Sequence, residues 1–428
     1  MSQYSENDKR VRNSPGLWRR SRLSVLHLGI RALMGCYGIA MSLAKLVGPK
    51  KRPAGVQGYE ILLTGTFYSD NWISSHLRPL AQSRYCARIR VVTIYPIAPI
   101  DKVQVVVPPA WLVRIVGGVP ARLLTFIWIG VRERPHFVGG FHLLFNGLMA
   151  ALLGRFIGAR SLYFCVGGPA EVLGGGIQSE NRLFEKLETP DTVVERQLLQ
   201  AVGGFDLIVT MGSTAKQFYQ SHGIAAPIQV VSGGLDASRY SPASTAATTD
   251  IVFVGRLAPI KRVDLFLQAI KQIQGKMPDI SAVVVGDGQM RDSLERLASE
   301  LGISRNVRFV GQQPDVGTWL RQARIFVLTS DSEGLSLALI EAMLCGLPAV
   351  VSRVGDLGDL VEDGVSGYLV SERSADAFAM RLLELLENND RREQFSRAAR
   401  QAAKRYEISA CTQLWDSILG EGQDPARH

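Results

Sequence analysis

The chain of 428 residues predicts two doubly wound α/β domains in series, preceded by an amphipathic helix. Its length exceeds what one ordinary hydrophobic core holds, so two domains are expected. Short apolar segments alternate with helical segments in two successive sets, which is typical of parallel βαβ units. The strands of the second set are almost continuously apolar, which indicates burial on both faces of a sheet. Two such domains predict a ligand-binding cleft between them.

The charge of the chain is concentrated at its N-terminus. The whole chain carries +9, and residues 1–57 alone hold 11 Lys/Arg and 2 Asp/Glu, which is also +9. The near-neutral remainder argues against a nucleic-acid-binding surface and favours a local basic patch. The five cysteines are scattered, so we expect neither a disulfide framework nor a zinc site, and a reducing compartment fits.

Residues 1–52 are expected to form a basic tail and a helix that lies at a membrane interface. Leu23–Val47 is mostly apolar, with one narrow polar stripe when drawn as a helix. The stripe consists of Ser24, His27, Arg31, Gly35, Gly38, Ser42 and Lys45. Basic residues flank the helix at Arg19, Arg20, Arg22, Lys50, Lys51 and Arg52. An arginine in mid-segment suits the headgroup region of an anionic cytoplasmic leaflet better than a membrane span.

Two other interpretations of this helix stay open, a membrane span and a helix packed on the protein itself. A signal peptide is the weaker interpretation, because no small-residue cleavage site follows. Trp111–Arg134 is a second candidate for membrane contact, since it mixes aromatic and arginine side chains. A buried helix with solvated ends explains that segment equally well.

Residues 53–235 predict an N-terminal Rossmann-like domain that binds the acceptor. The predicted strands are 59–64, 89–95, 137–139, 161–166, 207–210 and 229–231, and the predicted helices are 143–156, 193–202 and 214–222. In such sheets, ligands bind beyond the carboxyl ends of the strands. The loops there are 65–72, 141–147 and 167–176, and they make His142 and Glu171 the acceptor-side candidates.

Residues 236–250 resemble a linker, and residues 251–405 predict a second Rossmann-like domain that binds the donor. Residues 406–428 predict a C-terminal helix and tail that can pack back on the N-terminal domain. Within the second domain, the unit at 330–350 places two carboxylates, Glu333 and Glu341, around a turn at the start of a helix. Free backbone N–H groups at such a turn attract anions.

Two cations follow the first strand of the second domain, Arg256 after a glycine and Lys261 at the start of a helix. A departing diphosphate needs its developing charge neutralised by a metal or by fixed cations. We expect fixed cations and no metal or other cofactor, because no convincing pair of carboxylates follows an apolar strand end.

The second domain resembles the family-4 retaining glycosyltransferases of GT-B architecture. The motifs that carry the resemblance follow one another in family order over about 120 residues. They are Gly255-Arg256-Leu257 with Lys261, Val285-Gly286-Asp287-Gly288, Asn306–Gly311, the Glu333-x7-Glu341 pair, Gly346-Leu347-Pro348 and Asp363–Val370. Gly233-Gly234-Leu235-Asp236 with Arg239-Tyr240 is similar to the family's interdomain segment, with Gly233 in place of the usual Asn.

The resemblance implies a role for each matched residue. Arg256 and Lys261 would hold the donor diphosphate and Glu333 the donor sugar, as the catalytic set. The other donor-binding residues would be Gly255, Gly286, Asp287, Gly334, Leu335, Ser336 and Glu341, with Glu341 on the ribose. The family's acceptor-side histidine has no clear counterpart at Phe164–Pro169, and no general base is assigned. In this family the leaving phosphate is thought to take the acceptor proton.

The sequence thus predicts a metal-independent retaining glycosyltransferase that uses a nucleotide-diphosphate sugar and a saccharide acceptor. The membrane features favour a lipid-linked acceptor in cell-surface or exopolysaccharide synthesis, and a cytoplasmic protein attached peripherally to the membrane. Two alternatives are a nucleotide-sugar epimerase of the same fold and a non-catalytic scaffold in polysaccharide assembly. The transferase spacing of Glu333 and Glu341 disfavours both.

Overall fold

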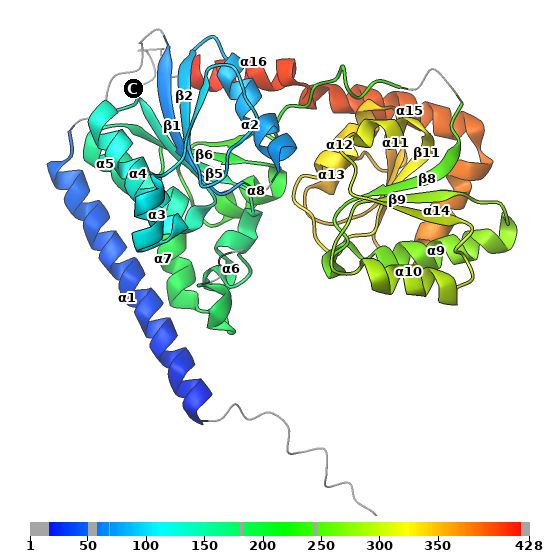
Figure 1. The fold of residues 1–428 in the computed structure, drawn as a ribbon, viewed down its shortest axis with the longest axis horizontal. Helices are drawn as coiled ribbons and strands as arrows, with labels where there is room; N and C mark the ends of the chain where they lie inside the picture. The colour runs from blue at the N-terminus through cyan, green and yellow to red at the C-terminus, as the bar shows by residue number, and fades with distance from the viewer. Residues whose placement is uncertain are drawn as a thin grey trace, which may run out of the picture.

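The protein folds into two α/β domains, each built on one parallel sheet (Figure 1). The computed structural model describes residues 17–49, 58–67, 69–179, 181, 183–242 and 246–420. The sheet of the N-terminal domain has seven strands in the order β3-β2-β1-β4-β5-β6-β7. They are β1 (Tyr59–Thr64), β2 (Cys86–Val92), β3 (Val103–Val106), β4 (Phe137–Phe141), β5 (Arg160–Cys165), β6 (Leu207–Thr210) and β7 (Ile228–Val230).

Helices connect these strands, as parallel pairing requires. They are α2 (Asp70–Gln82), α3 (Ala110–Val116), α4 (Gly118–Glu133), α5 (Leu148–Ile157), α6 (Leu173–Gly176), α7 (Thr192–Val202) and α8 (Ser213–Ser221). Side chains of α2 pack on one face of the sheet together with Trp415 and Leu419 from the C-terminal helix. Side chains of α5 and α7 cover the other face. The loops at the carboxyl ends of the strands are left to face the second domain.

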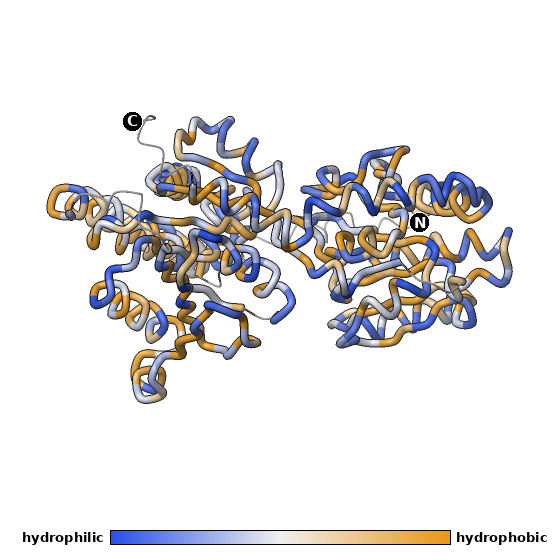
Figure 2. The backbone as a smooth tube through the Cα atoms, turned by 90° about the horizontal axis from the view of Figure 1, so that it is seen from above, coloured by the Kyte–Doolittle hydropathy of each residue, from blue (hydrophilic) through white to orange (hydrophobic). Residues whose placement is uncertain are grey.

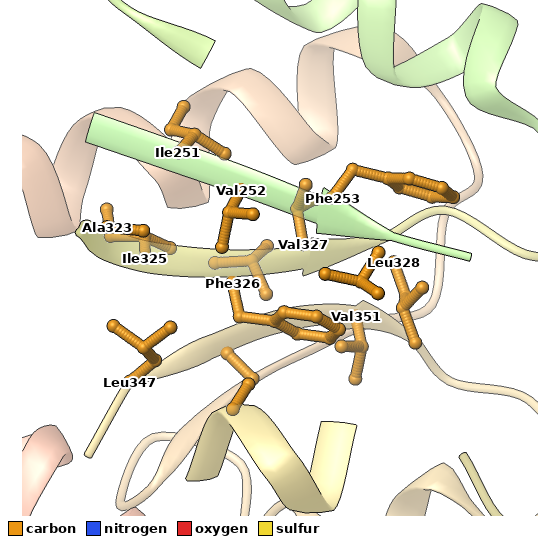
Figure 3. Close-up of a cluster of buried hydrophobic side chains, with 14 of the residues drawn as sticks. Ile251, Val252, Phe253, Ala323, Ile325, Phe326, Val327, Leu328, Leu347 and Val351 are labelled. Carbon is orange, nitrogen blue, oxygen red and sulfur yellow. The ribbon is translucent and has the colours of Figure 1, made fainter. Parts of the chain in front are cut away.

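The sheet of the C-terminal domain has six strands in the order β10-β9-β8-β11-β12-β13. They are β8 (Thr249–Val254), β9 (Ala282–Val285), β10 (Val307–Gly311), β11 (Ala323–Leu328), β12 (Ala349–Ser352) and β13 (Gly367–Val370). Its helices are α9 (Val263–Lys276), α10 (Arg291–Glu300), α11 (Val316–Arg321), α12 (Leu337–Leu344), α13 (Leu357–Leu360), α14 (Ala375–Glu387) and α15 (Asn389–Ala403). The central strands are apolar on both faces, as the sequence predicts, and side chains of β8, β11 and β12 interlock in the core (Figure 3).

The outer helices of this domain alternate hydrophilic and hydrophobic residues along the chain (Figure 2). This is the pattern of helices with one face on a core and one face in water. After α15 the chain crosses back, and α16 (Ile408–Gly420) lies on α2 of the N-terminal domain (Figure 1). Trp415 is buried there, and Asp416 accepts a hydrogen bond of 2.6 Å from Ser83. The last described helix therefore ties the two domains together.

Helix α1 (Leu17–Val47) runs along the side of the N-terminal domain that is remote from the C-terminal domain (Figure 1). Part of the predicted polar stripe binds α1 to the rest of the protein. In a helix that lies at a membrane interface, this stripe would face outward instead. His27 Nδ1 lies 2.7 Å and Arg31 Nε 2.9 Å from Asp191, the residue that caps α7. The side chains of the flanking arginines at 19, 20 and 22, and residues 50–52 altogether, lie outside the described residues.

The packing of α1 leaves a long apolar face exposed. Ile30, Met34 and Ala44 are buried against the domain. The opposite face is apolar as well and consists of Val25, Leu28, Leu33, Ile39, Leu43, Leu46 and Val47, all of them exposed. By length and composition Leu23–Val47 is the one described helix that could cross a membrane.

Several segments of the N-terminal domain differ from the sequence prediction, and three of them have a clear physical reason. The strand β3 was not predicted, because four residues at a sheet edge give little periodicity. Residues 143–156 were predicted as one helix, yet α5 begins only at Leu148. Before it, Phe145 has a φ of +66° and Asn146 donates a side-chain hydrogen bond of 2.6 Å to the carbonyl of Phe141. The segment at 111–134 forms two helices that meet at Gly117, where φ is +83°.

Candidate active site

A cavity of about 950 Å³ lies between the two domains, at the carboxyl ends of β8 and β9. The C-terminal domain contributes four predicted residues that directly follow these strands, Gly255, Arg256, Gly286 and Asp287, together with Glu341 from α12. The N-terminal domain contributes the first turns of α2. The structure therefore brings these five predicted donor-binding residues together. It also places residues of α2 in the wall of the same cavity, which the sequence did not predict.

Close approach of two loops explains the glycines at this edge. Gly286 has a φ of +138°, and a Cβ there would overlap the carbonyl oxygen of Gly255. Leu257 donates its N–H to the carbonyl of Asp287 at 2.9 Å, so the loops after β8 and β9 are joined by their backbones. A side chain at Gly286 would separate the loops that present Arg256 and Asp287 to the cavity.

Arg256 is exposed at the wall of the cavity, whereas Lys261 and Glu333 pair with each other. Lys261 Nζ lies 2.5 Å from Glu333 Oε1, and Ser330 donates to the same oxygen at 2.6 Å. Neither Lys261 nor Glu333 lines the 950 Å³ cavity. They hold the loop that enters α12, and this loop carries the next three predicted residues.

The turn of Gly334, Leu335 and Ser336 lies against the N-terminal domain. Leu335 packs against the core clusters of both domains. Ser336 caps α12, with its Oγ accepting the N–H of Leu339 at 3.3 Å. A Cβ on Gly334 would point at the carbonyl of Val166 across the cleft, at 3.9 Å. The start of α12 is thus the place where the two halves of the site meet.

Glu341 is buried and belongs to both halves of the protein. Its Oε1 accepts hydrogen bonds of 2.8 Å from Asn71 of α2 and from the hydroxyl of Tyr240. Burial raises the pKa of Glu341, and the bonds from Tyr240 and Asn71 partly offset that rise. A buried carboxylate held by two donors on one oxygen is well placed to accept hydroxyl groups of a ligand on the other.

A second cavity of about 360 Å³ lies in the N-terminal domain and adjoins the first at Ser69. Both acceptor-side candidates, His142 and Glu171, line it. His142 directly follows β4 and has a φ of +65° with a ψ of 146°, a region that residues other than glycine rarely adopt. Such strain persists only where the surroundings impose it, and it is concentrated at functional sites.

Glu171 imposes the conformation of His142. Its carboxylate accepts the backbone N–H of Leu143 at 2.5 Å and that of Gly167 at 2.6 Å. The same carboxylate lies 3.2 Å from His142 Nδ1 and accepts the hydroxyl of Tyr163 at 3.1 Å. Burial alone would raise the pKa of Glu171, but the charge and hydrogen bond of His142 and the two backbone N–H groups lower it.

Several residues of the two cavities were missed from the sequence. Trp72, Phe67 and Gln178 line the second cavity, and Arg78, Asn71 and Gln313 line the first. The sequence predicts a loop at residues 65–72, but no motif indicates which side chains of this loop point into the cavities. Gly233 has a local reason to replace Asn. Its φ is +89°, and a Cβ would lie 3.0 Å from Ser75 Oγ and 3.2 Å from the His76 ring.

Comparisons with known proteins show which sequences and folds this chain is similar to. Residues 239–402 match the family model of glycosyl transferases group 1. D-inositol 3-phosphate glycosyltransferase of Mycolicibacterium paratuberculosis is 35% identical over 213 residues, which are 46% of this chain and 47% of that protein. The enzyme of the same name from Mycobacterium tuberculosis H37Ra is 34% identical over 209 residues, or 46% and 43% of the two chains. The chain thus matches about half the length of these relatives.

Two solved structures share the whole two-domain architecture. Anabaena HepE in complex with UDP has a TM-score of 0.67 at 18% identity, over 85% of this chain and all of that one. Sucrose-phosphate synthase of Thermosynechococcus elongatus has a TM-score of 0.69 at 16% identity, over 85% and 98% of the two chains. The chain therefore has the GT-B fold, and its residues 239–402 are similar in sequence to glycosyl transferases group 1.

Proposed function

We propose that the protein is a retaining glycosyltransferase that moves a sugar from a nucleotide-diphosphate sugar to a saccharide acceptor without a metal. The observation that carries this proposal is the pair of adjoining cavities. One is lined by Arg256 and Glu341 in the group 1 domain, and the other by His142 in the N-terminal domain. The names of the relatives and the UDP bound to Anabaena HepE support a nucleotide sugar as donor.

Each of the predicted donor-side residues has a task in this reaction. Arg256 and Lys261 supply fixed positive charge for the diphosphate as it departs. Glu333, which pairs with Lys261 beside the start of α12, is assigned to the donor sugar by the family resemblance, and Glu341 accepts the ribose hydroxyls. The bond between the anomeric carbon and the phosphate oxygen breaks, and the acceptor oxygen bonds to that carbon on the same face. The acceptor proton passes to the leaving phosphate oxygen, so the step balances without a side-chain base.

We further propose that the acceptor is linked to a lipid and that the protein lies on the inner face of the cell membrane, in cell-surface or exopolysaccharide synthesis. The exposed apolar face of α1 supports this, since Leu23–Val47 contains no acidic residue. Helix α5 contacts both α1 and α4, and its Phe156 is exposed. On α3 and α4, Trp111 and Trp128 are exposed, and Arg132 lies over the Trp128 ring at 5.2 Å. Apolar, aromatic and basic side chains in this combination suit a lipid headgroup region.

The substitution Arg256→Ala tests the catalytic proposal most directly. Arg256 is exposed, so its removal leaves no buried charge behind. We expect kcat/KM for transfer to fall about 10²-fold or more, the effect of deleting one charge-stabilising donor. Lys261→Ala and Glu333→Gln should also abolish transfer. The control is Lys271→Ala on the surface of α9, where Lys271 contacts Gln274.

Release of UDP or GDP from the corresponding glucose and mannose donors is the measurement, with the thermal midpoint as the check on folding. Product analysis with donor alone separates transfer from epimerisation, since an epimerase converts the donor without an acceptor. Full activity of folded Arg256→Ala, Lys261→Ala and Glu333→Gln proteins would refute this site. Calorimetry that detects neither UDP nor GDP binding would favour the scaffold instead.

A further inference from the structure

The second cavity differs from the first in the charge of its walls. Three arginines line the 950 Å³ cavity, Arg78, Arg239 and Arg256. Among the described residues that line the 360 Å³ cavity there is no lysine or arginine. The ionisable groups on its described wall are His142 and Glu171, which already pair with each other at 3.2 Å. The described wall of the second cavity therefore offers a carboxylate and no fixed cation.

A phosphorylated ligand would be poorly held in such a cavity. A phosphate monoester carries close to two negative charges at neutral pH and is normally bound by arginine, lysine or a helix N-terminus. Here the phosphate would be desolvated beside Glu171, whose carboxylate is buried. Desolvating a charge beside a like charge without a partner costs several kcal/mol in proteins, roughly.

The remaining wall suits a neutral sugar ring. Trp72 and Phe67 line the cavity with ring centroids 6.3 Å apart and planes inclined by 25°. The ring of His76 packs against Trp72, at 4.2 Å between centroids. A pyranose has a face of C–H groups that packs on aromatic rings, and a rim of hydroxyls that need hydrogen bonds. The rim would meet the polar side chains of the wall, which are Thr66, Ser69, Gln178 and Ser179.

The position of the cavity matches the place where transfer must occur. Val166, on its wall, faces Gly334 of the donor loop across the cleft. Ser69 belongs to the walls of both cavities. The cavity that Trp72 and His142 line therefore opens next to the proposed donor side of the site.

We propose that the 360 Å³ cavity binds the terminal sugar of the acceptor as an uncharged pyranose, with Trp72 as its stacking platform and His142 orienting the reacting hydroxyl. This inference rests on the proposed function and deepens it by naming the acceptor class. It separates this chain from the relatives named above, whose names specify inositol 3-phosphate. Any phosphate that links the acceptor to a lipid then lies outside this cavity.

Matched pairs of acceptors test the charge of the ligand. The full-length protein is assayed with octyl glucoside, galactoside and mannoside, and with glucose 6-phosphate, mannose 6-phosphate and inositol 3-phosphate, using the UDP or GDP donor that it binds. We expect transfer to at least one neutral glycoside, with kcat/KM at least about 10²-fold above that of any phosphorylated acceptor, as an uncompensated charge requires. Preference for a phosphorylated acceptor, or use of phosphorylated acceptors alone, would overturn the inference.

Substitutions in the cavity test the assignment by residue. Trp72→Ala should raise the acceptor KM about tenfold, with the donor nucleotide Kd unchanged, and Trp72→Phe should restore most of the affinity. Gln178→Arg adds a cation at an exposed wall position and should shift preference toward phosphorylated acceptors. Tyr95→Ala, at an exposed aromatic residue elsewhere in the domain, should change neither.

The two proposals fail differently in these experiments. Absence of UDP and GDP binding contradicts the glycosyltransferase assignment itself, and unaffected transfer by the Arg256→Ala enzyme contradicts the assigned donor site. Normal donor binding with an unchanged acceptor KM in folded Trp72→Ala protein contradicts only the acceptor inference.

Discussion

The two cavities, which we propose bind the donor and the acceptor, differ in how their charged groups are held. The donor cavity presents exposed arginine on a frame of backbone contacts between loops, in which Gly286 touches Gly255. The acceptor cavity places a buried and fully hydrogen-bonded Glu171 behind a strained His142. An exposed cation tolerates different phosphate positions, whereas a buried network holds one geometry. Under the proposed assignment, donor binding would reside in replaceable charge and acceptor positioning in the fold of the N-terminal domain.

The largest expected effect is a loss of stability when Glu171, in the wall of the second cavity, is replaced by Gln. The variant loses a carboxylate that accepts two backbone N–H groups and pairs with His142. We expect the free energy of unfolding at pH 7 to fall by about 2–4 kcal/mol, the range for breaking a buried charged network. Urea unfolding measures this, with Glu300→Gln on the surface of the other domain as the control.

The lowered pKa of Glu171 also predicts how the stability of the protein depends on pH. Because the folded pKa of Glu171 is lowered, its contribution is fully present above the unfolded pKa of about 4.3 and is lost as pH falls through the folded value. The Glu171→Gln protein should therefore lose less stability than the wild type on acidification from pH 6. Equal acid sensitivity of the two proteins would contradict the ionised state assigned to Glu171.

The proposed membrane attachment is the second property that should differ between the domains, because the exposed apolar face of α1 belongs to the N-terminal domain alone. Leu43→Asp places a charge on that face, and Ser42→Asp places the same charge on the adjacent polar edge. We expect Leu43→Asp to weaken binding to anionic phospholipid vesicles about tenfold or more, from the lost burial of one leucine. Ser42→Asp is the matched control, and equal loss in both would indicate a charge effect without insertion of this face.

The smallest expected effect concerns the contact that joins the two cavities. Asn71→Ala removes one of the two donors to Glu341 Oε1 and should raise the Kd for the bound nucleotide about fivefold, the value of one hydrogen bond of roughly 1 kcal/mol. Gln82→Ala removes an exposed amide from the same helix and should leave the Kd unchanged. A Kd that is unchanged in Asn71→Ala would show that the donor cavity works independently of the acceptor domain.

The candidate site residues of the second domain could be predicted from the sequence because their positions depend on local features. Gly255, Arg256, Gly286 and Asp287 each directly follow a strand, and parallel strand ends meet at one edge of the sheet. The same rule predicted both domains as α/β and placed His142 and Glu171 in loops of the right edge. The role of a loop residue at that edge depends on which residues, distant in the sequence, contact it in the fold.

The sequence by itself therefore determined the two parallel sheets, the apolar strands of the second core and the line of residues along the donor edge, since short-range spacing encodes all of these. Only the tertiary structure decided that His27 and Arg31 bind Asp191 and leave the opposite face of α1 bare. It also decided that Glu341 is held by Asn71, 270 residues earlier in the chain. Contacts of such range are set by how the two domains pack, and no local pattern in the chain specifies them.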